Sequence, residues 1–308
     1  MLLALPRTRL GERGMLGGIL GRATTFGVVL LATTAISAVA AGAAGATETI
    51  IYNNIATPLP ANTPSEAFEA TQTSQFGGQV EFAGATTTKT KVTVGMSSWG
   101  CQSGSWTGTP ECITSGSPKF SWPVTLHVYN VGTANALGSQ ITELTRTFNM
   151  PYRPSQNNKR CTGASKGGWY QVRTKECFHG KLFTITFGLR GVTLPSKAII
   201  SVSYNTSDYG LEPQRPKSPA CETSSAGCFF DSLNVGLTEP TKFNVNKEPE
   251  PVPPFVGADP APEDAYQNSQ TAEQYCDKGL MGTGVFRLDS GLPPCWTGYQ
   301  PLLTVASL

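Results

Sequence analysis

Short segments in which hydrophobic and polar residues alternate dominate the chain from residue 47 onward. A period of two places alternate side chains on opposite faces of an extended strand, so each such segment predicts a strand with one buried face. Four segments show the pattern most clearly: 91–96, 124–129, 182–189 and 198–204. Weaker candidates are 49–52, 66–70, 79–83, 141–148, 232–237, 284–288 and 302–305.

Turn-forming residues separate these segments, and the 33 Gly and 23 Pro leave no stretch with a sustained helical period. About ten short strands joined by turns predict an all-β fold, in which two antiparallel sheets pack as a sandwich of jelly-roll type. About 260 residues are enough for one large core, so we expect residues 47–308 to form a single domain.

A proline-rich stretch at 239–264 interrupts this pattern with seven prolines. It is either a linker with polyproline character or a long crossover that returns the chain to complete a sheet. Residues 265–308 offer two weak strand candidates and one cysteine pair, which is little material for a separate core. We therefore expect a crossover, with Leu302 and Val305 buried in the main sandwich.

The first 46 residues have the features of a secretory signal. An apolar run at 26–40 is followed by small residues at 44–46, which form a cleavage site before Thr47, and residues 38–40 offer a second site. Met15 is an alternative start to Met1. An uncleaved membrane anchor is the competing interpretation, but we expect cleavage and secretion. The run is preceded by four arginines: Arg7, Arg9, Arg13 and Arg22.

The charge of the chain changes once this signal is set aside. Four of the 23 Lys and Arg residues and one of the 21 Asp and Glu residues precede Thr47, which leaves 19 basic and 20 acidic residues and a net charge of −1. Such a chain has no basic field to attract nucleic acid or an anionic membrane surface. We therefore expect neither as a partner, and the oligomeric state stays open.

The eight cysteines fall into four close couples separated by long gaps. An even number in an exported chain favours disulfides, and the spacing predicts pairing within each couple: Cys101–Cys112, Cys161–Cys177, Cys221–Cys228 and Cys276–Cys295. A zinc site is the alternative, but no Cys-x2-Cys spacing occurs and the only histidines are His127 and His179. We expect no metal and no cofactor.

Five segments of the chain resemble a family of secreted bacterial proteins whose function is uncharacterised. The resemblance implies export and a β-sandwich, but it assigns no catalytic or binding residue. The segments are SEAFEATQTSQFGGQVEFAG (65–84), MSSWGCQSG (96–104), FNMPYRPS (148–155), FFDSLNVGL (229–237) and CWTGYQP (295–301).

Candidates for nucleophilic catalysis are few. Residues 163–167 match the G-x-S-x-G pattern of hydrolases, but no helix follows the serine, as that motif requires. His127 and His179 can act as bases in principle, yet no nucleophile lies beside either in the sequence. A structural role is the simpler interpretation for all three.

Acidic residues offer two further possibilities. A pair of carboxylates that converge from different strands can hydrolyse a glycosidic bond, and five acids on or beside candidate strands qualify: Glu66, Glu69, Glu81, Asp231 and Asp289. A calcium loop can use oxygen ligands that lie close together, although the order of a defined calcium loop is missing. Those ligands would be Asp259, Glu263, Asp264 and Asn268.

Aromatic residues gather on the predicted disulfide loops, where binding residues of β-sandwiches concentrate. Exposed rings there can stack on the C–H faces of sugars. We take Trp106 and Trp169 as a possible shared platform, whereas Trp99, which follows a strand, is expected to pack over its disulfide and close a small satellite core. The candidate binding residues are Trp106, Trp169, Tyr170 and Trp296.

Three functions fit these observations. The first is a secreted, non-catalytic binding or surface-interaction protein with an extracellular glycan or a cell-surface component as its partner. The second is an extracellular polysaccharide hydrolase with two carboxylates, and the third is a structural envelope protein without a small ligand. Converging carboxylates in a groove would favour the enzyme, and exposed rings without them would favour binding.

Overall fold

The computed structural model describes residues 47–215, 221, 224, 227–239, 253–291 and 295–308. These residues belong to one compact unit that runs from Ala46 to Leu308. The predicted signal, its cleavage sites and residues 240–252 of the proline-rich stretch lie outside the described residues. In the part of the chain that is described, no helix has the length and apolarity needed to cross a membrane.

The fold is all-β, as predicted, because strands account for 42% of the residues and no helix reaches seven residues in the described part of the chain. The strands form two six-stranded antiparallel sheets and a small two-stranded sheet, β7 (Trp169–Gln171) with β8 (Glu176–Phe178). Four 3₁₀ turns are also described: η1 (Thr133–Asn135), η2 (Gly163–Ser165), η3 (Phe229–Ser232) and η4 (Ala272–Gln274).

The first large sheet, here called the β4 sheet, is organised around β4, which pairs with three other strands. β9 pairs with one edge of β4 along its whole length, whereas β14 and β11 share the other edge, end to end. β1 lies outside β14, and β2 lies outside β11. The six strands are β1 (Thr49–Asn53), β2 (Ser65–Glu66), β4 (Lys89–Ser98), β9 (Lys181–Arg190), β11 (Leu233–Gly236) and β14 (Leu303–Ser307).

The second large sheet, here called the β5 sheet, has the order β13-β12-β3-β10-β5-β6. Most connections in the chain pass from one sheet to the other, which is the connectivity of jelly-roll sandwiches. Its strands are β3 (Thr73–Glu81), β5 (Lys119–Val131), β6 (Leu137–Pro151), β10 (Lys197–Ser203), β12 (Ala265–Ser269) and β13 (Arg287–Asp289).

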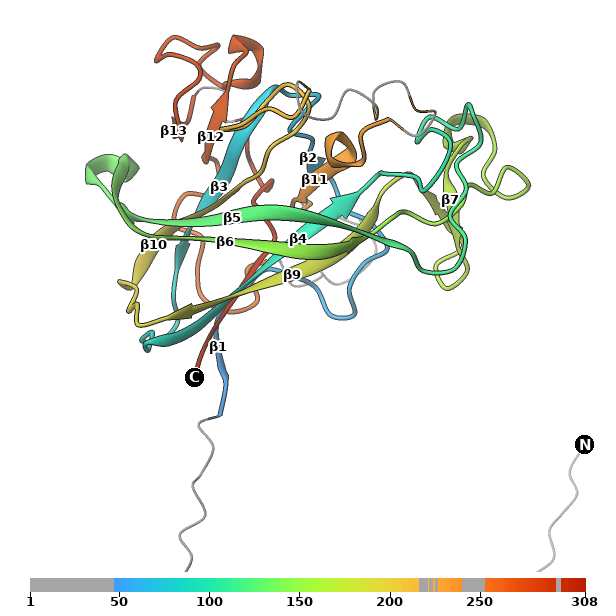
Figure 1. Ribbon diagram of the computed structural model, residues 1–308. Coiled ribbons are helices and arrows are strands. Elements are labelled where there is room, and N and C mark those ends of the chain that lie inside the picture. The colour runs from blue at the N-terminus through green and yellow to red at the C-terminus, as the bar shows by residue number, and fades with distance from the viewer. Residues whose placement is uncertain (1–46, 216–220, 222–223, 225–226, 240–252, 292–294) are drawn as a thin grey trace, which may run out of the picture. The chain divides into compact units, whose positions relative to one another are not determined.

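The two sheets pack face to face over one hydrophobic core, and β5 and β6 cross in front of β4 and β9 in Figure 1. Alternate residues of the predicted strands supply this core, as their period of two requires. The β4 sheet contributes Val92, Val94, Met96, Ile185, Phe187, Leu303 and Val305, and the β5 sheet contributes Phe76, Val124, Leu126, Val128, Ile200 and Val202.

All eight cysteines are paired in the four couples that the spacing predicts: Cys101–Cys112, Cys161–Cys177, Cys221–Cys228 and Cys276–Cys295. Four disulfides are typical of a protein that folds in an oxidising environment. The first two loops meet at one end of the sandwich, beside β7 in Figure 1, where a Cβ at Gly108 would lie 2.8 Å from the Cα of Gly167.

The C-terminal strand completes the main sandwich. β14 lies between β4 and β1, and both Leu302 and Val305 are buried, as expected. The end of the proline-rich stretch connects the two sheets, because Val256 pairs with Asn53 of β1 in one sheet and Ala258 pairs with Glu81 of β3 in the other. These contacts fit a crossover rather than a linker to a separate domain.

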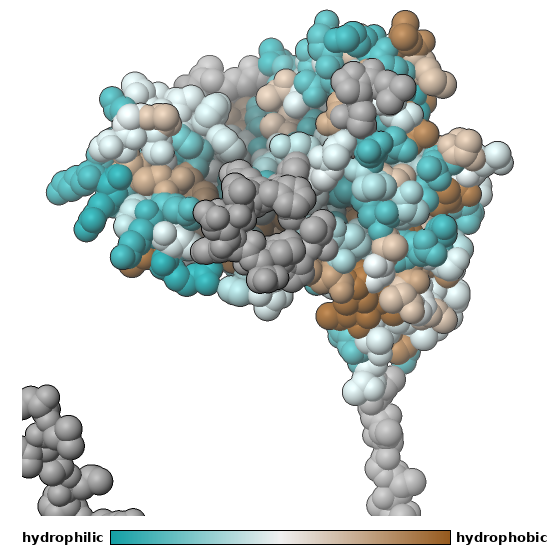
Figure 2. Space-filling model, turned by 180° about the vertical axis from the view of Figure 1, so that it is seen from behind, coloured by the Kyte–Doolittle hydropathy of each residue, from teal (hydrophilic) through white to brown (hydrophobic). Residues whose placement is uncertain are grey.

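Hydrophobic residues on the surface are scattered. In Figure 2, which views the protein from behind, hydrophobic atoms form separate patches among hydrophilic ones, and one patch lies at the end that carries β12 and β13. The connection between these strands exposes Leu280, Met281 and Val285. Isolated exposed apolar residues are ordinary on protein surfaces, so none of these patches by itself indicates an interaction site.

The position of β14 predicts the effect of a truncation. A chain that ends at residue 248 loses β12, β13 and β14, and the β4 sheet loses a strand that is paired on both edges. We expect this chain to lack a cooperative thermal transition and a native circular dichroism spectrum. A truncated protein with the melting temperature of the full chain would show that the last 60 or so residues are an appendage.

Candidate functional site

A groove with a volume of about 490 Å³ opens at the end of the β4 sheet that carries β2 and β11. Three separate parts of the chain line it: residues 63–70 around β2, Trp99 with Trp106, and residues 231–234 at the start of β11. The pairing of β4 with β11 and of β11 with β2 brings these parts together. The site therefore depends on long-range strand pairing.

Trp99 forms one wall of the groove and follows directly after the last residue of β4. Its backbone N–H donates to the Ser232 carbonyl at 2.8 Å, which continues the pairing between β4 and β11. One side of its ring stacks on His179, with centroids 5.9 Å apart and planes 17° apart. Trp99 is half-buried, so its ring is partly covered by these contacts and also lines the groove.

Trp106 stands beside Trp99 and is the exposed ring of the pair. The two ring centroids lie 5.4 Å apart with planes inclined by 78°, and residue Trp106 is 45% exposed to solvent. Trp106 is thus accessible from solvent on the Cys101–Cys112 loop, and its role in binding stays a prediction. The two indoles thus make an open corner, and each presents aromatic surface to the groove.

A buried arginine holds the loop that carries Trp106. The Arg153 guanidinium is fully buried and donates to three backbone carbonyls, those of Trp106 (3.3 Å), Gly167 (2.7 Å) and Pro154 (3.3 Å). It therefore joins the two disulfide loops. Burial lowers the pKa of Arg153 to about 10, so the group stays charged at neutral pH.

Two carboxylates, Asp231 and Glu69, lie in the groove. Asp231 accepts hydrogen bonds from the Ser207 backbone N–H at 2.7 Å and from the Ser207 hydroxyl at 2.6 Å, one on each oxygen. Glu69 accepts a longer one, 3.3 Å, from the Asp208 N–H. Partial burial raises the pKa of Glu69; a hydrogen bond with Thr206 opposes this rise, and the charge of Asp231 adds to it.

The other aromatic candidates do not reach this groove. Trp169 is buried, and its Nε1–H donates to the Gly180 carbonyl at 2.8 Å, so Trp106 and Trp169 form no exposed platform. Tyr170 is half-buried beneath the Arg160 guanidinium. Trp296 is buried against Phe76, and its Nε1–H donates to Asp289 at 2.7 Å.

The other acidic candidates have structural partners. Glu66 is buried and accepts a hydrogen bond from Thr73 at 3.3 Å, and Glu81 forms an ion pair with Lys197 at 3.2 Å. Asp289 is buried and accepts hydrogen bonds from Gln267, Trp296 and the Cys276 N–H. Each of these carboxylates thus has a local role in the fold.

Metal-binding clusters are scarce in the described residues. The acids suggested for calcium, Asp259, Glu263 and Asp264, do not form a group of three there, and Asn268 lies on β12. The one group that does occur joins Asp289 to Cys276 and Cys295, whose sulfurs are bonded to each other. A disulfide offers no thiolate to a metal.

The serine and histidine candidates occupy structural positions. Ser165, of the G-x-S-x-G match, sits in the 3₁₀ turn η2. His127 has a neighbour that the sequence did not suggest, because Ser203 Oγ lies 2.8 Å from its Nε2 while Glu143 lies 3.4 Å from its Nδ1. His127 and Ser203 are both buried, and Nδ1 makes no hydrogen bond, so this trio lacks the access that a nucleophile needs.

Comparison with known proteins leaves the site without a precedent: no protein-family model, curated protein or solved structure matches the chain. The resemblance to a family of secreted bacterial proteins therefore stays a prediction. Three of the five segments quoted for it, 65–84, 96–104 and 229–237, supply residues to the groove.

The role of Arg153 can be tested by Arg153→Lys. A lysine keeps the charge, but its single nitrogen cannot serve three carbonyls that a planar guanidinium reaches together. We expect unfolding in urea to show a loss of about 2 kcal/mol, because buried carbonyls lose their donor. The control is Arg146→Lys on the exposed face of β6, which should change stability by less than about 0.5 kcal/mol. Equal effects of the two changes would contradict the anchoring role.

Proposed function

We propose that the protein is an exported, non-catalytic binding protein and that the groove beside Trp99 and Trp106 takes an extracellular glycan. The observation that carries this proposal is the indole corner, with centroids 5.4 Å apart, in an open groove. Indole faces stack on the apolar faces of sugar rings, and nearby polar groups give orientation. Ser65 and Asn234, hydrogen-bonded to each other at 3.0 Å, supply such groups.

Export is part of the proposal. The arginine-rich start, the apolar run and the small residues before Thr47 support removal of a signal peptide. The four disulfides support an oxidising destination. Partners outside the cell are therefore the relevant class, and glycans and cell-wall polymers are abundant among them.

A polysaccharide hydrolase is the second candidate, because two carboxylates lie in the same groove as the rings. The raised pKa of Glu69 would suit a general acid. Asp231 fits less well, since each of its oxygens already accepts a hydrogen bond from Ser207. Release of reducing ends from a panel of polysaccharides, abolished by Glu69→Gln, would establish the enzyme instead.

The binding proposal predicts the effect of Trp106→Ala. Loss of a stacked ring should weaken glycan binding about tenfold, or by about 1–2 kcal/mol, in isothermal titration with the ligand selected by a glycan and cell-wall pull-down. The melting temperature should stay within a few degrees, because the ring is exposed and Arg153 holds the backbone carbonyl rather than the side chain.

The control for this variant is Ile113→Ala. Ile113 is 47% exposed and follows the same disulfide loop, but it does not line the groove. It should leave affinity unchanged. Strong destabilisation by Trp106→Ala would make that ring a packing residue, and a wild-type protein that binds no glycan in the pull-down would favour a structural envelope role.

A further inference from the structure

The electrostatic character of the groove narrows the class of ligand. Among its described lining residues are two carboxylates, Glu69 and Asp231, and no lysine, arginine or histidine. The hydrogen bonds described for Glu69 come from Thr206 and from the Asp208 N–H, and neither donor carries a positive charge. A ligand with negative charges, such as a uronic acid polymer, would be repelled from this site.

The aromatic walls of the groove also favour a positively charged ligand. The faces of indole rings carry negative electrostatic potential, and two such rings set nearly at right angles form part of a cage for a cation. Trp99 and Trp106 meet at 78°. Such a corner can hold a sugar ring against one indole face, and a compact ammonium group on that sugar gains from both walls.

The His179 imidazole, which stacks on Trp99, does not repel a cation in the groove. His179 stacks on the far side of that ring at 5.9 Å. Burial, and then the positive charge of Arg153, lower the pKa of His179, which favours its neutral form. The Arg153 guanidinium is itself fully buried and directed at carbonyl groups, not at the groove.

From these walls and charges we propose that the groove recognises a protonated amine, and that its glycan ligands contain amino sugars with free amino groups. This inference rests on the proposed function, because it specifies which glycans the groove takes. The ammonium would lie at the Trp99–Trp106 corner with Glu69 as its counter-ion, while the sugar ring contacts the apolar residues around Ala67 and Ala70.

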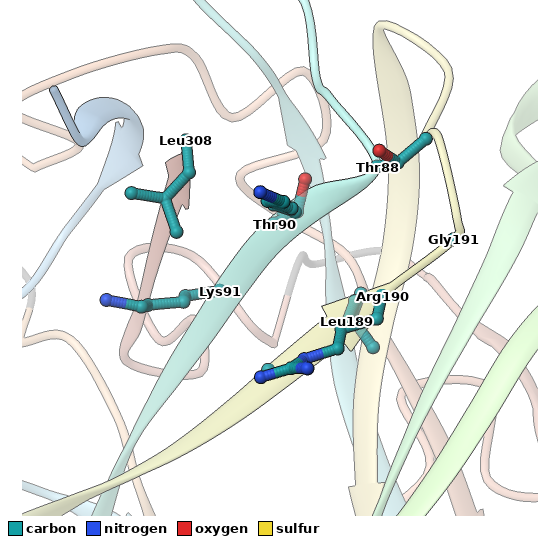
Figure 3. A pocket seen from close by; sticks show the side chains of 9 residues that line it. Thr88, Thr90, Lys91, Leu189, Arg190, Gly191 and Leu308 are labelled. Carbon is teal, nitrogen blue, oxygen red and sulfur yellow. The ribbon is translucent and has the colours of Figure 1, made fainter. Parts of the chain in front are cut away.

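The other end of β4 carries a pocket that is lined by positively charged side chains. A pocket of about 430 Å³ is lined by Lys89, Lys91 and Arg190, and Figure 3 shows Lys91 and Arg190 extending to the same side of β4 and β9. β4 has ten residues, so this pocket lies about 30 Å from Trp99. That distance exceeds the Debye length at physiological salt, about 8 Å, so the two sites act independently.

The test compares two trisaccharides with the same backbone, one of β-1,4-linked glucosamine and one of its N-acetylated form, by isothermal titration at pH 6 and physiological salt. We expect the glucosamine trisaccharide to bind at least about tenfold more tightly, because only it carries ammonium groups. Added salt should reduce this difference.

Two matched variants test whether Glu69 causes the preference for the glucosamine trisaccharide. Glu69→Gln should remove most of the difference between the trisaccharides. Glu111→Gln, which neutralises an exposed carboxylate in the Trp106 loop outside the groove lining, should keep it. Equal loss in both variants would mean unspecific attraction to an acidic surface and would overturn the inference.

The outcomes separate this inference from the proposed function. Equal affinity for the two trisaccharides, with both sensitive to Trp106→Ala, would overturn the amine preference and leave glycan binding in place. Binding of neither trisaccharide, together with capture of another glycan in the pull-down, would do the same. Failure of every glycan to bind would overturn both.

Discussion

The shared edge of β4 is the constraint on which the sandwich and the groove both depend. β14 pairs with the first half of this edge and β11 with the second, and the two meet opposite Gly95. The Gly95 N–H donates to the Leu302 carbonyl at 2.8 Å, and a Cβ at position 95 would lie 2.6 Å from Leu302 Cβ. Only glycine admits this approach. Without it, β11 and β14 could not follow one another along β4, and the residues that flank Trp99 would not reach the groove.

Much of the fold follows from local pattern, because a period of two and a short cysteine spacing act within a few residues. The strands around Val92, Val124 and Ile185 and the four disulfides were predictable on this basis. The groove was not. Glu69, Trp99 and Asp231 are brought together by non-local pairing, and no spacing in the sequence records which strand becomes the neighbour of β4.

The exposure of aromatic rings was harder to predict than the strands, and Trp106 and Trp169 show why. Both lie in disulfide loops rich in glycine and serine, yet one is 45% exposed and the other 7%. Trp169 is buried because a backbone acceptor, the Gly180 carbonyl, lies within reach of its indole N–H. Arg153 adds a second lesson: no pattern in FNMPYRPS predicts its burial, yet it is buried and joins both loops through hydrogen bonds to backbone carbonyls.

The way the groove is supported bears on whether it binds or catalyses. Its walls are fixed by the fold itself: Trp99 by Ser232 and His179, the Trp106 backbone by Arg153, and Asp231 by Ser207. Walls held in this way lower the entropic cost of association, which favours recognition. A hydrolytic pair must instead leave each carboxylate able to exchange a proton or approach a sugar carbon. Both Asp231 oxygens accept hydrogen bonds from Ser207, so this carboxylate suits the fixed wall of a binding site better than the nucleophile or proton donor of a hydrolase.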